Sequence, residues 1–255
     1  MNTLSVVVIT FNEEKKIGAC LESVKSIADE IVVVDSNSSD ATETICSQYG
    51  AKFVTQKWLG YAEQKNLADD LATCDLIFSI DADEALSDTL RQSIMDLKAR
   101  KIADNEVFSM NRLNNFCGKW IKRCGLYPDN KVRIWKRGFA EWKGLIHETL
   151  LFQNQPRTTK LEGDLLHYSF DTRDEFVKQQ FHFAALSGQK YHDEGKKSWF
   201  PNIIISPLVC FIRTYLVKGG FLEGRDGFFI CRTEAQATRH KYKTLKDLQN
   251  KKSQP

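Results

Sequence analysis

The chain has 255 residues and a formal net charge of +3, with 42% hydrophobic and 27% charged residues. This length suits one full α/β domain with an appendage, and the composition excludes disordered, collagen-like and disulfide-dense proteins. A net charge this small gives no reason to expect a nucleic-acid partner.

The first hundred residues alternate between strand-like and helix-like segments. Residues 4–9 form a short β-branched run, typical of a strand buried on both faces, and no basic lead precedes it that would indicate a signal peptide. Asn12 then offers a cap for the first helix. Such an alternation predicts a parallel, doubly wound sheet with helices on both faces. We predict strands at 4–9, 31–34, 51–54 and 76–80, and helices at 12–24, 40–49, 61–72 and 87–101.

The pattern changes after Asn105. Residues 106–110 and 131–136 are strand-like, and aromatic, Gly-rich loops lie between and after them. We interpret these segments as antiparallel additions to the sheet. A long helix is predicted over residues 171–194.

Residues 199–222 are apolar but interrupted by prolines and by Arg213, so we expect this segment not to span a bilayer. It can lie in the membrane interface, with Trp199, Phe200 and Tyr215 at headgroup depth, and the basic tail at 239–252 favours anionic lipid. The alternative is a hydrophobic hairpin packed on the domain or on a second subunit, with the tail as a solvated helix face.

The seven cysteines include no Cys-x-x-Cys pair, and several lie in apolar, helix-like contexts. We therefore expect reduced thiols in a cytosolic protein. A bridge or metal site at Cys117 and Cys124 is the alternative, although no nearby residue completes a metal site there.

Three of the predicted strands end in polar clusters, at 10–13, 35–38 and 81–83. In an open parallel sheet, ligands bind beyond the carboxyl ends of the strands, where the strand order reverses. We therefore expect the clusters to converge on one crevice that binds a nucleotide. The candidate residues are Thr10, Phe11, Asn12, Glu13, Asp35, Ser36, Ser38, Asp81, Ala82 and Asp83.

Asp81 and Asp83 directly follow a predicted buried strand. Two carboxylates at this spacing make a hard-oxygen site of the kind that Mg²⁺ or Mn²⁺ prefers, and such an ion neutralises a diphosphate leaving group. A pair of turn or helix-capping carboxylates is the alternative. Asp35 can accept hydrogen bonds from a base or a ribose, or it can form an Asx-type turn.

Glycine-rich phosphate loops do not occur in the sequence. No G-x-G-x-x-G follows the first strand and no G-x-x-x-x-G-K-[ST] is present, so we expect neither a dinucleotide dehydrogenase nor a P-loop ATPase. Phosphates would then be held by a metal and by basic side chains, for which Lys65 and Arg133 are candidates.

These motifs resemble the family 2 glycosyltransferases of the GT-A fold. The resemblance rests on Val6–Glu13, Ile31–Asp40 and Ile80–Glu84, which occur in the family's order, and on Gln64-Lys65-Asn66 in the helix before the metal strand. It implies an α/β, doubly wound and mostly parallel sheet with a C-terminal helical extension. It also implies a metal-dependent glycosyltransferase.

The second half is similar to a narrower branch, the bacterial lipopolysaccharide core glucosyltransferases. The similarity rests on residues 127–136 and 144–148. It implies a UDP-sugar donor, by default UDP-glucose, and a lipid-linked glycan acceptor such as the lipopolysaccharide inner core. It further implies a cytoplasmic protein peripheral to the inner membrane. We divide the chain into a catalytic domain at 1–170, with a nucleotide-sugar half at 1–105 and an acceptor half at 106–170, and a helical extension at 171–255.

The resemblance also implies roles for single residues. Thr10, Asn12, Glu13 and Asp35 would hold the nucleoside, Asp83 the metal, and Asp81 the ribose or the metal shell. Many members of the family carry a Glu-Asp pair that supplies the catalytic base, and His147-Glu148 falls at that place. We nominate Glu148 as the base, with His147 as a metal ligand or as the group that orients Glu148. Acceptor or phosphate contacts are expected from Tyr127, Asp129, Arg133 and Trp142, sugar stacking from Trp120, Tyr127 and Trp142, and reserve bases are Asp129, Glu223 and Asp226.

Three readings of the function compete. The first is an inverting transferase acting on a lipid-anchored glycan, with another nucleotide sugar and another cell-surface glycan as its variant. The second is a nucleotidyltransferase, but that class carries a Gly- and Arg-rich loop after its first strand, and residues 10–16 contain no glycine. The third is a non-catalytic scaffold that binds nucleotide sugars. A homo-oligomer remains open in each.

Overall fold

The computed structural model describes residues 1–144 and 148–252. It divides into two compact units. The first comprises Met1–Leu113 and Asp129–Tyr168, and the second comprises Asn114–Pro128 and Ser169–Pro255.

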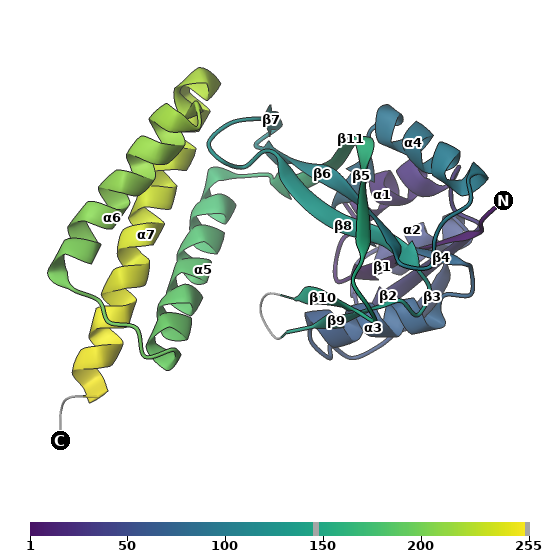
Figure 1. Ribbon diagram of the computed structural model, residues 1–255, viewed down its shortest axis with the longest axis horizontal. Helices are drawn as coiled ribbons and strands as arrows, with labels where there is room; N and C mark the ends of the chain where they lie inside the picture. The colour runs from purple at the N-terminus through teal and green to yellow at the C-terminus, as the bar shows by residue number, and fades with distance from the viewer. Residues whose placement is uncertain (145–147, 253–255) are drawn as a thin grey trace. The chain divides into compact units, whose positions relative to one another are not determined.

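The first unit is built on a large mixed sheet with the strand order β3-β2-β1-β4-β8-β6-β11-β5 (Figure 1). The strands β1 to β4 are parallel, which confirms the α/β prediction for the first hundred residues. The chain adds β2 and β3 on one side of β1 and then places β4 on the other side, so the strand order reverses between β1 and β4. These strands are β1 (Leu4–Thr10), β2 (Glu30–Asp35), β3 (Lys52–Thr55) and β4 (Leu76–Asp81).

The rest of the sheet is largely antiparallel, as the change of pattern after Asn105 predicted. β8 pairs antiparallel with β4 and with β6, and β11 pairs antiparallel with β5. β7 pairs with β6, while β9 and β10 form a separate two-stranded antiparallel sheet. The bounds are β5 (Glu84–Leu86), β6 (Glu106–Phe116), β7 (Lys119–Ile121), β8 (Asp129–Lys136), β9 (Ala140–Lys143), β10 (Thr149–Phe152) and β11 (Arg157–Phe170).

Helices cover both faces of the sheet, because alternate residues of β1 point to opposite sides. Val6 and Val8 pack in one core with α1 (Ile17–Val24) and α4 (Asp88–Ala99). Cys46 of α2 (Thr42–Gln48) belongs to the same core. Val7 packs in a second core with α3 (Tyr61–Leu71) and with the tryptophans of β8 and β9. Each fully buried aliphatic side chain contributes about 1.5–3 kcal/mol, so the two cores fix the positions of the strand ends.

The first helix begins later than the sequence predicted. Asn12 does not cap it; α1 begins at Ile17 with Lys16 as its N-cap, and Asn12 has a φ of 53°. The side chain of Asn12 instead accepts a hydrogen bond from the backbone N–H of Ser39 at 2.9 Å. Its own N–H donates to Ser38 Oγ at 2.7 Å. Asn12 therefore ties the end of β1 to the loop after β2, and this tertiary role overrides the capping preference.

The second unit is mainly helical. Its helix α5 (Arg173–Asp193) begins with a capping box between Thr172 and Glu175, at the place where a long helix was predicted. The core of this unit joins α5 and α7 (Gly224–Lys252) to the loop region around β7. Its fully packed side chains are Phe116, Ile121, Cys124, Phe176, Ile230 and Cys231.

The apolar segment is more regular than we predicted. It forms α6 (Phe200–Ile212), which runs on through Pro207, and a π-helical turn at Arg213–Val217, followed by a 3-10 turn at Gly220–Glu223. By length and composition, the 18 residues Phe200–Val217 are the one helical stretch in the described chain that could cross a membrane. Pro207 and Arg213 therefore do not break the helix, and the expectation that the segment does not span a bilayer stays a prediction. All seven cysteines lie within the described chain as free thiols.

Candidate active site

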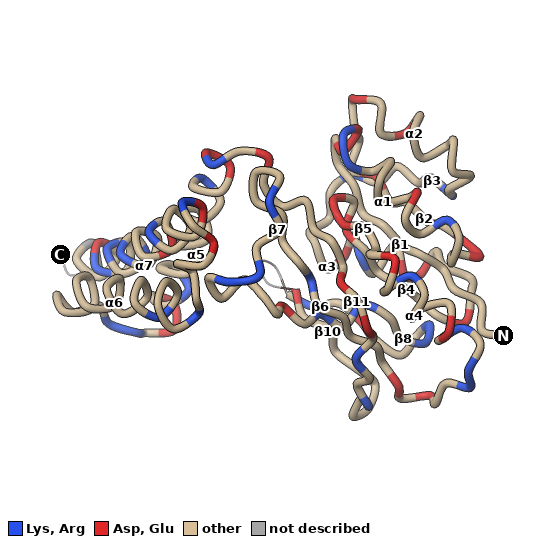
Figure 2. Tube along the Cα trace, turned by 90° about the horizontal axis from the view of Figure 1, so that it is seen from above, with Lys and Arg blue, Asp and Glu red and all other residues tan. Residues whose placement is uncertain are grey.

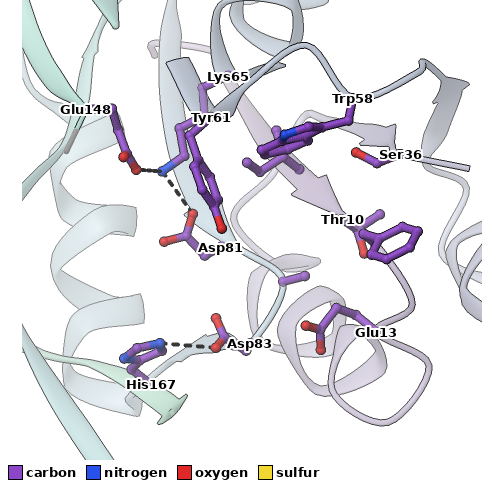
Figure 3. A pocket seen from close by; sticks show the side chains of 13 residues that line it. Thr10, Glu13, Ser36, Trp58, Tyr61, Lys65, Asp81, Asp83, Glu148 and His167 are labelled. Carbon is purple, nitrogen blue, oxygen red and sulfur yellow. Dashed lines mark hydrogen bonds and ion pairs between the residues drawn. The ribbon is translucent and has the colours of Figure 1, made fainter. Parts of the chain in front are cut away.

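A cavity of about 710 Å³ lies at the carboxyl ends of β1, β2 and β4, beside the point where the strand order reverses (Figure 3). It brings together residues from all three strand-end clusters, together with Lys65 of α3 and Glu148. The convergence that the sequence predicted therefore occurs. The lining residues are Ile9, Thr10, Phe11, Glu13, Ser36, Trp58, Tyr61, Lys65, Asp81, Ala82, Asp83, Glu148 and His167.

Lys65 connects two carboxylates of the cavity. Its ammonium nitrogen lies 3.1 Å from Asp81 Oδ1 and 3.2 Å from Glu148 Oε1, although these carboxylates are far apart in sequence. The Lys65 side chain is only 5% exposed, whereas those of Asp81 and Glu148 are 28% and 22% exposed. The carboxylates therefore reach the cavity while the cation between them stays covered. Figure 3 shows Lys65 between the two.

Arg133 binds the second carboxylate oxygen of Asp81, the one that Lys65 does not contact. Its guanidinium donates to Asp81 Oδ2 at 2.8 Å and to both oxygens of the fully buried Glu84, at 2.8 and 3.0 Å. Burial raises the pKa of Asp81, but the charges of Arg133 and Lys65 outweigh it and hold that pKa well below its usual range. Arg133 does not line the cavity, so the structure gives it the role of fixing Asp81 where the sequence suggested a phosphate contact.

Asp83 has a different partner, which sequence reasoning missed. Its Oδ2 lies 3.1 Å from Nε2 of His167, near the end of β11. The backbone supports this contact, because the N–H of Tyr168 donates to the carbonyl of Asp83 at 2.9 Å. Asp83 and His167 are 84 residues apart, and only the pairing of β11 with β5 brings them together. The other predicted metal ligand, His147, lies outside the described residues.

The cluster after β2 is only partly open to the cavity. Ser36 lines it, but Asp35 is 2% exposed and accepts a hydrogen bond from the backbone N–H of Ser38 at 2.7 Å. This is the local turn that we considered as the alternative for Asp35. Asn12 and Ser38 are likewise absent from the lining residues.

Two exposed aromatic rings, which the sequence analysis did not single out, line the cavity. Trp58 and Tyr61 are 45% and 51% exposed, and their rings meet edge to face at 4.8 Å. They flank Gly60, which has a φ of 112° and forms the N-cap of α3. Two large aromatic residues around a glycine in a loop before a helix were the available signal.

The predicted acceptor residues do not gather at the cavity. Trp142 is 7% exposed and packs under Lys65, whose ammonium lies 4.6 Å from the ring centroid, so its face is not open to a sugar. Asp129 forms ion pairs with Arg112 and Lys131. Tyr127 and Trp120 belong to the second unit. Of the reserve bases, Glu223 pairs with Lys119 and Asp226 with Arg173, all within that unit.

Comparison with known proteins gives a consistent result. The family model described as "Glycosyl transferase family 2" matches residues 5–123. The chain is 30% identical over 237 residues to an uncharacterized glycosyltransferase of Rickettsia felis. This alignment covers 89% of this chain and 84% of that relative. It is 29% identical over 244 residues to the lipopolysaccharide core biosynthesis glycosyltransferase LpsC of Rhizobium meliloti. That alignment covers 91% of this chain and 87% of LpsC. A crystal structure of a mycobacterial protein aligns with a TM-score of 0.50 at 16% identity, over 73% of this chain and 74% of that one, which is a likeness of fold.

Proposed function

Since the chain belongs to glycosyl transferase family 2, we propose that it is an inverting hexosyltransferase. Its donor is a UDP-sugar, by default UDP-glucose, and its acceptor is a lipid-linked glycan such as the lipopolysaccharide inner core. The observation that carries the proposal is the cavity at the strand ends, which gathers Asp81, Asp83, Lys65 and Glu148. The likeness to LpsC, which is named for lipopolysaccharide core biosynthesis, supports the acceptor class.

The size and lining of the cavity suit a nucleotide sugar. Ligand sites of drug-sized molecules occupy about 300–1,000 Å³, and this cavity has about 710 Å³. The exposed rings of Trp58 and Tyr61 offer a stacking surface for a pyrimidine base. Thr10, Glu13 and Ser36 add polar groups on the side of the cavity away from Lys65 and Glu148, where the ribose would lie (Figure 3).

The donor atoms around Asp83 fit a divalent cation. Its carboxylate and the imidazole of His167 face each other, and Asp81 lies on the same strand-turn. Within the described residues, no group of three or more His, Cys, Asp or Glu side chains forms a ready metal cluster. A site with few protein ligands is the kind in which Mg²⁺ or Mn²⁺ completes its shell with phosphate oxygens and water. When bound, such an ion would neutralise the charge of the departing diphosphate.

The position of Glu148 supports its role as the base. Its carboxylate lines the cavity and is held by Lys65. In an inverting transfer, an acceptor hydroxyl oxygen attacks the anomeric carbon while the bond from that carbon to the diphosphate oxygen breaks. The hydroxyl proton passes to Glu148, because a sugar hydroxyl is a poor nucleophile unless its proton is removed. Lys65 and Arg133 keep Asp81 ionised and fixed during this step.

The acceptor class and the helical unit point to the cytoplasmic face of the inner membrane as the place of action. The apolar residues of α6 are largely exposed, which suits peripheral contact with lipid. A second copy of the chain covering α6 is the competing explanation. The competing function is a scaffold that binds UDP-sugars without turnover.

Turnover measured with the intact chain tests the proposal. We expect UDP release from UDP-glucose in the presence of Mn²⁺ and truncated lipopolysaccharide that exposes inner-core heptose, with the opposite anomeric configuration in the product by NMR. Glu148→Gln should lower kcat by about 10²–10⁴-fold with little change in the KM for UDP-glucose, the range for losing a general base.

The matched control is Glu141→Gln, an exposed glutamate on the neighbouring strand β9. It should retain wild-type turnover. Full activity of Glu148→Gln would remove the base assignment. UDP binding without turnover of any UDP-sugar in a donor panel would favour the scaffold.

A further inference from the structure

A second cavity, of about 430 Å³, lies within the helical unit between α5, α7 and the turn after α6. Three cations line it, Arg213, Lys218 and Lys241, and the hydroxyl groups of Ser187 and Thr238 add polar contacts. Nothing in the transferase reaction proposed above uses these residues.

Among the described residues, no ion pair neutralises the cations of this cavity, although Arg213 interacts with the charge of Glu234, and the Lys241 ammonium lies 4.8 and 4.7 Å from the ring centroids of Tyr191 and Tyr242. In the part of the chain that the structure describes, none of the three forms an ion pair with a carboxylate, whereas many other basic residues do. The one carboxyl group in the lining is Glu234, whose pKa burial raises to about 7 against the pull of Arg213. The cavity therefore keeps a net positive charge at neutral pH, and an anion with several oxygens, such as a phosphate, would relieve the repulsion among the cations.

The cavity opens beside an apolar face on the same helical turns. Val209, Ile212 and Leu216 are 55%, 43% and 57% exposed. The residues next to them in the helix, Arg213 and Thr214, line the cavity. The apolar face continues toward the start of α6 through Ile204, Ile205 and Leu208. Figure 2 shows most of α6 in tan, while charged residues are frequent along α7.

The packing of α6 against α7 argues against an orientation in which α6 spans a membrane. Its helix lies beside α7, which carries charged residues on successive turns, including Arg232, Arg239 and Lys243 (Figures 1 and 2). A spanning α6 would carry these charges into the hydrocarbon core, where each costs several kcal/mol. In the interface, the apolar face can enter the acyl region while neighbouring cations remain at headgroup depth.

We propose that this cavity binds the phosphate group of an anionic membrane lipid while the apolar face of α6 contacts the acyl chains of the bilayer. The phosphate is held by Arg213, Lys218 and Lys241. The site is separate from glycosyl transfer and does not depend on the donor or acceptor proposed above.

Vesicle binding by the full-length chain tests this site. The probes are phosphatidylcholine vesicles and vesicles of equal parts phosphatidylcholine and phosphatidylglycerol. Arg213→Gln/Lys218→Gln should weaken binding to the anionic vesicles by about tenfold or more, because each basic residue near an anionic surface contributes about fivefold. The matched control, Arg232→Gln/Arg239→Gln, removes the same charge from exposed positions outside the cavity and should lose less.

The apolar contact is tested by Ile212→Ser/Leu216→Ser. Both residues are exposed, so the helix should stay folded, which circular dichroism checks. This variant should lose binding to neutral and anionic vesicles alike. All of these variants should keep the UDP-sugar turnover of the wild type in detergent solution, so failure of this proposal can be told apart from failure of the transferase proposal.

Three results would overturn the site. Equal losses in the cavity variant and its control would mean that charge acts without a cavity. Displacement of wild type from anionic vesicles by low concentrations of inorganic phosphate would assign the cavity to a soluble anion. A dimer in light scattering that Ile212→Ser/Leu216→Ser dissociates, with no vesicle binding by wild type, would assign the apolar face to a second copy.

Discussion

Lys65 and Asp69 lie one turn apart on α3. Their charged groups differ in their contacts, and the local sequence does not predict this difference. Lys65 is buried yet satisfied by two carboxylates, Asp81 and Glu148. Asp69 is also buried, but no donor among the described residues meets the usual distance and angle for a hydrogen bond to its carboxylate, and the nearby Trp142 side chain lowers its pKa only slightly. The sequence marks Lys65 as a candidate for binding phosphate but gives no sign of the two carboxylates that it contacts, and it gives no sign that Asp69 is buried.

The pH dependence of stability should reveal Asp69. Burial, with the charge of Asp70, raises its pKa from 3.8 to about 8, and the charge of Lys65 and the Trp142 side chain only partly offset this. The folded chain therefore holds the proton more tightly than the unfolded chain, so this stabilisation is complete below pH 3.8 and is lost as the pH rises toward 8. We expect the free energy of unfolding in urea to fall with rising pH in this window, by on the order of 1 kcal/mol per pH unit.

Asp69→Asn should remove most of this dependence and be more stable than wild type near pH 8. Asp96→Asn, an exposed aspartate on α4, should leave the dependence as it is. An unchanged pH profile in Asp69→Asn would show that Asp69 titrates normally.

The residues that sequence analysis found and those that it missed differ in the range of their contacts. Thr10, Asp81 and Asp83 end buried strand runs, and parallel strand ends converge whatever the rest of the fold does. His167 was missed because its approach to Asp83 depends on strand pairing between distant segments. Asn12 was assigned to a helix cap because local residue preferences do not predict its hydrogen bond to Ser39 in the loop after β2.

At the scale of elements, the close approach of β11 to α4 fixes where His167 lies. Gly163 of β11 has a φ of 90°, and a Cβ placed there would come within 2.3 Å of the backbone nitrogen of Leu90 in α4. The strand and the helix can pack this closely only because residue 163 has no side chain. The strand then continues to His167 at the cavity.

Gly163→Ala should therefore destabilise the chain by more than about 3 kcal/mol in urea unfolding, at the upper end of single substitutions. Gly138→Ala provides the control, because Gly138 has a φ of 79° but a Cβ added there would meet no atom within 4 Å. It should cost only about 1–2 kcal/mol of backbone strain. Equal losses would mean that α4 and β11 do not pack closely at this point.

At the scale of the whole molecule, the two compact units interleave in sequence. Residues 114–128 belong to the helical unit although strands of the first unit precede and follow them. Phe116 and Cys124 pack there with Phe176 and Ile230. The predicted boundary at residue 170 follows hydrophobic periodicity along the chain. That periodicity carries no information about an earlier segment that packs with a later one. That boundary and its functional assignments stay a prediction.

Hydrogen exchange should separate the two units functionally. UDP with Mn²⁺ should slow amide exchange at residues 10–13, 36 and 81–84, which line or border the cavity. At a ligand concentration of 100 Kd the slowing can reach roughly hundredfold where exchange requires loss of the bound ligand. Exchange in α5 and α7 should stay the same. Equal protection in the helical unit would place UDP elsewhere or couple the two units on binding.

Calorimetric titration of UDP into the chain, with and without Mn²⁺, tests most directly whether the strand-end cavity is a metal-dependent nucleotide site. We predict binding that requires Mn²⁺, is abolished by Asp83→Ala and is retained by Asp104→Ala, whose carboxylate is exposed and away from the cavity. No binding of UDP, or binding indifferent to both Mn²⁺ and Asp83, would contradict the account.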